Sequence, residues 1–186
     1  MASMNTSVGS GASSSSSAVQ SHAREMLIVG LRNAHGLERQ AIEMLERNVE
    51  RLEHYPELRQ QLTRHLAESR EQQAMVEECL SELGESSSSL KDTVMGLAQN
   101  MQQMMHAAAD DEVLKNSFAG YAFEHFEIAA YTALEIFAER AGEAHIARVA
   151  RTICDQERRM AEWLENHLPD VVDEHLELMR SGEQKH

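Results

Sequence analysis

Four stretches of the sequence place a glutamate inside a series of apolar residues that recurs at helical spacing. These glutamates are Glu38, Glu68, Glu124 and Glu157, and Glu127 follows Glu124 by one turn on the same helical face. A carboxylate loses several kcal/mol of hydration in an apolar interior unless a proton or a cation compensates its charge. Because converging carboxylates also repel one another, a chain with this pattern is expected to hold one or two cations between its helices.

The composition favours a purely helical fold. The 186 residues include only two prolines and nine glycines, and residue types with high helix propensity are abundant. The periodicity of the apolar residues and the positions of helix-breaking residues predict four long helices. They span approximately His22 to Leu52, Pro56 to Leu83, Asp110 to Ala141 and Glu143 to His167.

The order of these helices predicts how they pack. Turns at Tyr55-Pro56 and at Gly142 form two antiparallel hairpins, and the long connection between the hairpins can run the length of a bundle. In each hairpin the two stripe glutamates lie at similar distances from the turn, so antiparallel packing brings them to the same height. We therefore predict an all-α fold, a ferritin-like four-helix bundle with a long crossover, plus a short C-terminal helix after Pro169.

The same pattern divides the chain into three parts. Residues 1–20 are rich in serine and are expected to form a disordered tail, because they cannot bury enough apolar area to order themselves. Residues 21–178 are expected to form the single bundle domain, and residues 179–186 a flexible C-terminus.

The charge and the cysteines argue against several classes of protein. The formal net charge is −14, and the basic residues are scattered among acidic ones, which disfavours binding to nucleic acid. Cys79 and Cys154 each lie on an apolar stripe and are expected to be buried thiols, as is usual in a reducing cytoplasm. No signal peptide and no apolar segment of bilayer length is found, so we expect a cytoplasmic protein that does not enter a membrane.

Three segments resemble the ferritin-like bacterial stress-protein family typified by YciF and YciE, which has long been described as a domain of unknown function. They are His65-Leu66-Ala67-Glu68-Ser69, the stretch from Glu124 to Tyr131 with Leu134, and Asp155-Gln156-Glu157. The similarity covers approximately His22 to Leu168, and the segment that begins at Glu124 is its most specific part.

The resemblance implies a rubrerythrin-like bundle that forms homodimers, takes part in a stress response and binds two metal ions. The metal ligands that it implies are Glu38, Glu68, Glu124, Glu127 and Glu157. Iron is the first choice by resemblance and manganese the alternative, because oxygen donors alone do not select one cation. The implied chemistry is a reaction with oxygen or peroxide, for which an external electron donor is expected.

Nitrogen ligands are not found where ferritins and rubrerythrins usually have them, in Glu-x-x-His motifs on two helices. The third residue after Glu68 is Glu71, and the third after Glu157 is Met160. Other side chains at helical spacing can take the part of ligands or of residues that hold ligands in place. They are His35, His65, Gln72, Tyr121 and Tyr131.

A second hypothesis needs no metal. A helical bundle that dimerises, with an acidic surface and a serine-rich tail that recruit partners, would be a structural or interaction protein rather than an enzyme. The sequence alone leaves both hypotheses open.

Overall fold

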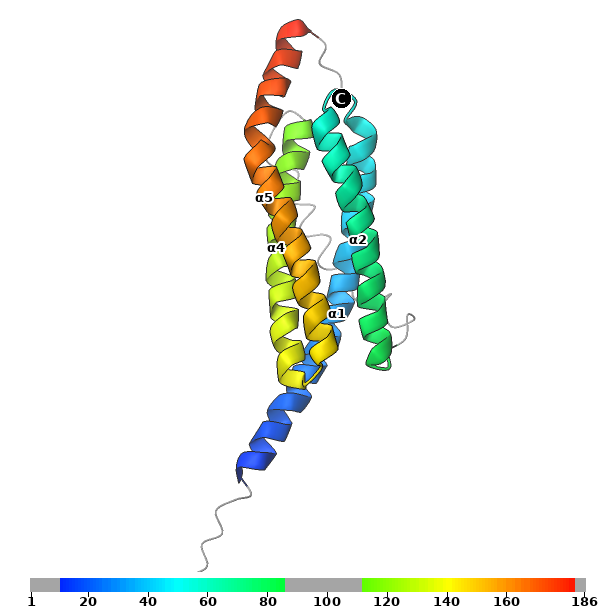
Figure 1. Ribbon diagram of the computed structural model, residues 1–186, viewed down its shortest axis with the longest axis vertical. Helices are drawn as coiled ribbons and strands as arrows, with labels where there is room; N and C mark the ends of the chain where they lie inside the picture. The colour runs from blue at the N-terminus through cyan, green and yellow to red at the C-terminus, as the bar shows by residue number, and fades with distance from the viewer. Residues whose placement is uncertain (1–10, 86–111, 183–186) are drawn as a thin grey trace, which may run out of the picture.

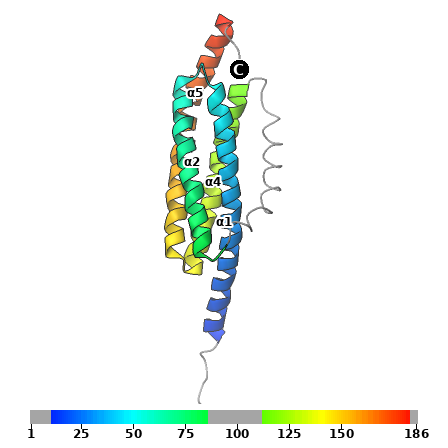
Figure 2. The same cartoon turned by 90° about the vertical axis from the view of Figure 1, so that its right-hand side faces the viewer.

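The computed structural model describes residues 11–85 and 112–182, and these residues form four α-helices and no strand. The helices are α1 (Gly11–Arg51), α2 (Pro56–Glu82), α4 (Glu112–Ala141) and α5 (Ala144–Ser181). Helix α1 packs against α2 and α4, and α5 packs against the same two helices. Neighbouring helices are antiparallel, and α2 ends at the opposite end of the bundle from the start of α4 (Figures 1 and 2). The predicted all-α bundle of two hairpins is confirmed, while the crossover lies outside the described residues.

Proline and glycine define the two hairpin turns as predicted. Pro56 is in the first turn of α2, where its missing N–H removes no intrahelical bond. Gly142 ends α4 with φ of 85°, the left-handed conformation that glycine adopts without steric cost. Its N–H donates to the Glu139 carbonyl at 3.2 Å, and the Glu143 N–H donates to the Ala138 carbonyl at 2.9 Å. This pair of bonds is a Schellman motif, which satisfies the last carbonyls of the helix.

The apolar core consists of two large clusters at opposite ends of the bundle and a small third one, formed by Leu37, Ala41, Met44 and Phe123. One of the large clusters contains Leu27, Val76, Leu134 and Ile153, and the other contains Leu45, Leu52, Leu62, Met160 and Leu164. On every helix a set of buried polar residues separates the residues of the first cluster from those of the second. The fold therefore contains a polar layer across its middle, enclosed at both ends by apolar side chains.

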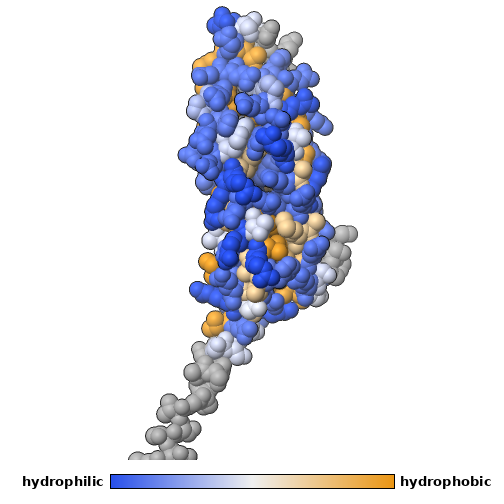
Figure 3. Space-filling view, in the orientation of Figure 1, coloured by the Kyte–Doolittle hydropathy of each residue, from blue (hydrophilic) through white to orange (hydrophobic). Residues whose placement is uncertain are grey.

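The outer surface of the bundle is mainly hydrophilic. Hydrophilic side chains cover most of the face drawn in Figure 3, in keeping with the net charge of −14. None of the helices in the described parts of the chain is long and apolar enough to cross a membrane.

Helix α1 begins eleven residues earlier than predicted. The prediction of a disordered tail over residues 1–20 is wrong for residues 11–20, which form the first turns of α1, while residues 1–10 lie outside the described residues. Serine costs only a fraction of a kcal/mol relative to alanine in a helix, and extending an existing helix needs no new nucleus. The Gln20 amide also donates to the Ala141 carbonyl at 3.0 Å, which ties this part of α1 to the end of α4.

The separate C-terminal helix was also predicted incorrectly. Helix α5 continues through Pro169 as far as Ser181, so the C-terminal segment is part of the fourth helix, and residues 183–186 lie outside the described residues. Pro169 is exposed and removes one helical hydrogen bond. Beyond it Val171 and His175 are buried, and Val171 belongs to the second apolar cluster. This packing favours continuation of the helix.

Two Gly→Ala substitutions on α4 and its turn should have opposite effects on stability. Gly142→Ala forces a side chain into the left-handed region and should lower the free energy of unfolding by about 1 kcal/mol. Gly120→Ala lies inside α4, where an added Cβ meets only Leu164 Cδ1 at 3.9 Å. It should raise the free energy of unfolding by about 0.5 to 1 kcal/mol. Urea unfolding followed by circular dichroism measures both, and two changes of the same sign would contradict the prediction.

Candidate metal centre

The polar layer contains seven side chains that are at most 2% exposed. They come from all four helices: Glu38 from α1, His65 and Gln72 from α2, Glu124, Glu127 and Tyr131 from α4, and Glu157 from α5. Apolar residues of the two clusters precede and follow them on each helix, so the helical periodicity that builds the core also turns these polar groups inward. The fold thus concentrates acidic groups where water is excluded.

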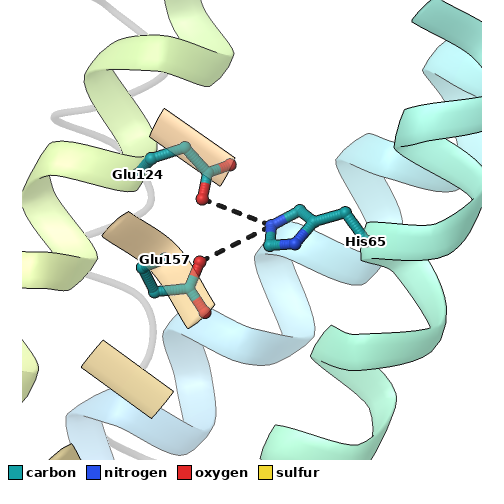
Figure 4. Close-up of side chains that lie close together, drawn as sticks. All are labelled: His65, Glu124 and Glu157. Carbon is teal, nitrogen blue, oxygen red and sulfur yellow. Dashed lines mark ion pairs between the residues drawn. The ribbon is translucent and has the colours of Figure 1, made fainter. Parts of the chain in front are cut away.

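Three of these residues form a compact triad. His65 Nε2 lies 3.2 Å from Glu124 Oε2 and 3.5 Å from Glu157 Oε2. Figure 4 shows both carboxylates directed at the imidazole from α4 and α5, across from α2. One ligand atom from each of the three residues lies within 4.8 Å of the other two. One imidazole nitrogen and two carboxylates at this separation can surround a single transition-metal ion.

Hydrogen bonds hold the carboxyl groups of Glu38 and Glu157 in place. The Tyr131 hydroxyl donates to Glu38 Oε1, and the Gln72 amide donates to Glu157 Oε1. The same amide donates to Gln156 Oε1 at 3.2 Å. Each of the two glutamates therefore has one oxygen held by a neutral donor.

Five buried oxygen atoms of the layer accept no hydrogen bond. They are Glu38 Oε2, Gln72 Oε1, Glu124 Oε2, Glu127 Oε1 and Glu157 Oε2. A buried acceptor without a partner costs about 1 to 3 kcal/mol, and more when it is charged. Within the described parts of the chain, no arginine or lysine forms an ion pair with these four glutamates. Among the described residues, His65 is thus the one basic side chain that contacts this group of acidic residues.

Burial and mutual repulsion make three of these carboxyl groups, those of Glu38, Glu127 and Glu157, hold their protons. Burial raises the pKa of Glu38 to about 8, although the hydrogen bond from Tyr131 opposes the change. Burial and the charge of Glu124 raise the pKa of Glu157 to about 10. Burial and the charges of Glu38, Glu157 and Glu124 also raise the pKa of Glu127 well above its usual range. Protons therefore take the place of a cation in the metal-free layer.

His65 responds in the opposite sense to the same surroundings. Burial lowers the pKa of its imidazole, but the negative charge of Glu124, with support from Glu68 and Glu157, outweighs this effect and raises the pKa well above its usual value. A site that favours the protonated, positively charged form of its histidine is chemically suited to a cation.

Comparison with known proteins assigns the chain to a family. The family model described as "Domain of unknown function (DUF892)" matches residues 22–177. The chain belongs to this family. The resemblance to YciF found in the sequence is thereby confirmed.

Three solved structures share the fold. A protein from Xanthomonas campestris pv. campestris is 37% identical, with a TM-score of 0.72 over 86% of this chain and 99% of that one. YcfI from Rhodopseudomonas palustris, described as a putative structural protein, is 25% identical, with a TM-score of 0.62 over 77% and 92%. The E. coli stress protein YciF is 21% identical, with a TM-score of 0.65 over 81% and 97%, and this similarity shows the fold alone.

The structure brings together four of the five glutamates that the resemblance implies as ligands. Glu38, Glu124, Glu127 and Glu157 lie in the polar layer, but the Glu68 side chain is 40% exposed. The prediction that Glu68 points inward is therefore wrong. Glu68 lies at the edge of the buried face of α2, about 60° around the helix from His65, so its carboxylate reaches outward.

His65 takes the inward position on α2. Glu68 Oε2 lies 3.3 Å from His65 Nδ1, the ring nitrogen that does not face the triad. The sequence contained a signal for this arrangement, because His65 and Gln72 are seven residues apart at the centre of the apolar face. Such carboxylate–histidine pairs commonly orient metal-binding imidazoles.

Two other predicted residues lie outside the layer. His35 Nε2 pairs with Glu77 Oε1 at 2.8 Å, at the contact between α1 and α2. Tyr121 is half-buried, and its ring packs edge-to-face against His125 at a centroid distance of 4.6 Å. By contrast Gln72 and Tyr131, predicted as supporting residues, hydrogen bond to layer glutamates.

The metal-free protein should become less stable as the pH rises from about 5 to 8. In this window Glu38 and Glu157 keep protons in the folded state that they lose in the unfolded state, where the pKa is 4.5. Each such group lowers the free energy of unfolding by up to about 1.4 kcal/mol per pH unit. Glu38→Gln, whose amide can still accept from Tyr131, should reduce this dependence.

Chemical unfolding of chelator-treated protein at several pH values measures the slope. Glu43→Gln, which changes an exposed carboxylate on the same helix, is the matched control and should keep the wild-type slope. Equal slopes for wild type and Glu38→Gln would show that Glu38 ionises in the folded protein as readily as it does in water.

Proposed function

We propose that the polar layer binds a dinuclear metal centre, with iron the first candidate and manganese the second, and that the protein is an oxidoreductase. The observation that carries this proposal is the set of five buried oxygen atoms without hydrogen bonds. A packed core does not bury several carboxylates without compensation, whereas one or two cations would satisfy all of these atoms at once.

The donor set fits such an ion. His65, Glu124 and Glu157 would hold one cation, because their ligand atoms already converge. Glu38 and Glu127 would supply oxygens for the second, since the charges of Glu38 and Glu157 both act on Glu127. Carboxylates with one imidazole suit Fe²⁺ and Mn²⁺, while the Irving–Williams order means that affinity alone does not select between them.

The remaining residues of the layer would position the ligands. Tyr131 holds Glu38, Gln72 holds Glu157 and Glu68 holds His65, each by a hydrogen bond or a close polar contact. The apolar clusters above and below the layer exclude water, which strengthens every electrostatic interaction within it. An iron centre of this kind supplies electron transfer with dioxygen or peroxide when it is bound.

The biological context of the proposal is protection during stress. The fold is that of the E. coli stress protein YciF, and Cys79 and Cys154 are buried free thiols, as expected in a reducing cytoplasm. A homodimer and an external electron donor are further parts of the proposal. The competing function, a metal-free structural or interaction bundle, is the other outcome of the following test.

Wild-type protein loaded anaerobically with Fe²⁺ or Mn²⁺ should retain about two ions per chain after desalting, measured by elemental analysis. The double variant Glu124→Ala/Glu157→Ala should lose most of the metal, because it removes ligands from the triad. The control double variant Glu139→Ala/Glu162→Ala removes exposed glutamates from the same two helices and should bind as wild type. Folded wild-type protein that retains no metal would support the structural function instead.

Glu68→Ala should weaken metal binding by about 10- to 100-fold, the usual effect of removing a carboxylate that orients a ligand histidine. Glu68→Gln, which can still accept from His65 Nδ1, should restore part of the affinity. Glu71→Ala removes an exposed glutamate of the same helix and serves as the control. Competition with a chelator gives the dissociation constants, and the Co²⁺ absorption spectrum reports whether the ligand geometry changes. Unchanged affinity and spectrum in Glu68→Ala would show that the His65–Glu68 contact has no such role.

A further inference from the structure

A cavity in the bundle begins at the metal-binding triad. Glu124 forms part of its lining, and side chains from all four helices form the rest. The cavity extends toward the end of the bundle where α1 ends and α4 begins, which is the upper end in Figure 1. At this end Asn48 and Asn116 are half-buried and Arg51 is exposed. The lining thus runs from Glu124 in the polar layer to residues at this end of the bundle.

The lining between these two ends is mainly apolar, and the hydroxyl of the one polar residue described there, Ser117, donates to the Val113 carbonyl at 2.9 Å. Leu45, Leu62, Met160 and Leu164 belong to this lining, and all four are buried members of the second apolar cluster. The cavity volume is about 30 Å³, against the roughly 10 to 15 Å³ that one water molecule needs by the same measure. A molecule of two or three heavy atoms can therefore occupy it without displacing side chains.

The inner end of the cavity carries an acceptor that packing does not explain. Glu124 is 2% exposed, and its Oε2 atom accepts no hydrogen bond, although it lies 3.2 Å from His65 Nε2. The leucine and methionine side chains of the lining give neither an anion nor a hydrated cation any ligands. The molecule that these surroundings favour is small, neutral and apolar.

Gly120 keeps the cavity open. It precedes Glu124 by one turn on the same face of α4 and belongs to the lining. An added Cβ there would have Leu164 Cδ1 as its nearest neighbour, at 3.9 Å across the cavity. Any longer side chain at this position must therefore enter the space that the glycine leaves.

We propose that this cavity is the access route by which dioxygen reaches the metal centre, and that Gly120 sets its width. The proposal rests on the proposed function for its purpose, but the binding of dioxygen in the cavity is independent of the metal. An apolar cavity holds an apolar gas in preference to water, because water would lose its hydrogen bonds there.

The first test uses metal-free protein and the paramagnetism of dioxygen. Under increased oxygen pressure, the methyl groups of Leu45, Leu62 and Met160 should relax faster in NMR than exposed methyl groups such as those of Val29 and Leu176. In Gly120→Leu the enhancement at the cavity methyls should fall to the level of other buried methyls, such as those of Leu27. Gly120→Ala should give an intermediate value and, because its change is small, covers the case that Gly120→Leu does not fold.

Ala119→Leu is the matched control, because it adds the same side chain to the neighbouring position of α4, which is not part of the lining. It should leave the enhancement unchanged. Two results would overturn the proposal. One is that dioxygen enhances the relaxation of the cavity methyls and of the Leu27 methyls equally in the wild type. The other is that Ala119→Leu and Gly120→Leu reduce the enhancement at the cavity methyls equally.

A second measurement connects the cavity to the centre. After anaerobic loading with Fe²⁺, oxidation by dissolved dioxygen should be about tenfold slower in Gly120→Leu than in wild type and Ala119→Leu, at equal metal content. Equal rates would show that dioxygen reaches the centre by another route. Absence of metal binding together with the expected NMR result would reject the proposed function and leave dioxygen binding in the cavity established.

Discussion

The burial of acidic side chains across the middle of the bundle is the constraint on which the rest of the structure depends. Glu38, Glu124, Glu127 and Glu157 are almost fully buried, and His65 is the one cationic side chain in contact with them among the described residues. Hydrophobic association at the two ends must offset the cost of burying these polar groups. The fold therefore has its stabilising apolar contacts at the two ends and its buried acidic residues in the middle.

The sequence predicted those parts of the structure that depend on periodicity and on helix-breaking residues. The spacing of apolar residues predicted the helices, and Pro56 and Gly142 predicted the turns. The positions of Glu38, Glu124 and Glu157 within the apolar faces of their helices predicted that these side chains are buried. Each of these is a local property, because the face on which a residue lies follows from its place in a regular helix.

The incorrect predictions involve contacts between helices, which no local pattern encodes. Glu68 occupies the edge of its stripe, so whether it turns in or out depends on how α2 is rotated against α4 and α5. The continuation of α5 beyond Pro169 depends on the burial of Val171 and His175, which offsets the unfavourable proline. The early start of α1 likewise involves the contact of Gln20 with Ala141, on a different hairpin.

The polar layer also joins the two hairpins. Glu38 and His65 belong to the first hairpin, and the remaining three carboxylates of the layer belong to the second. Metal ions bound by ligands from both hairpins would hold the hairpins together, whereas the protonated layer has only hydrogen bonds and polar contacts between them. A cell short of metal would then contain a looser form of this protein, more open to proteases, so that metal supply would set how long each copy survives.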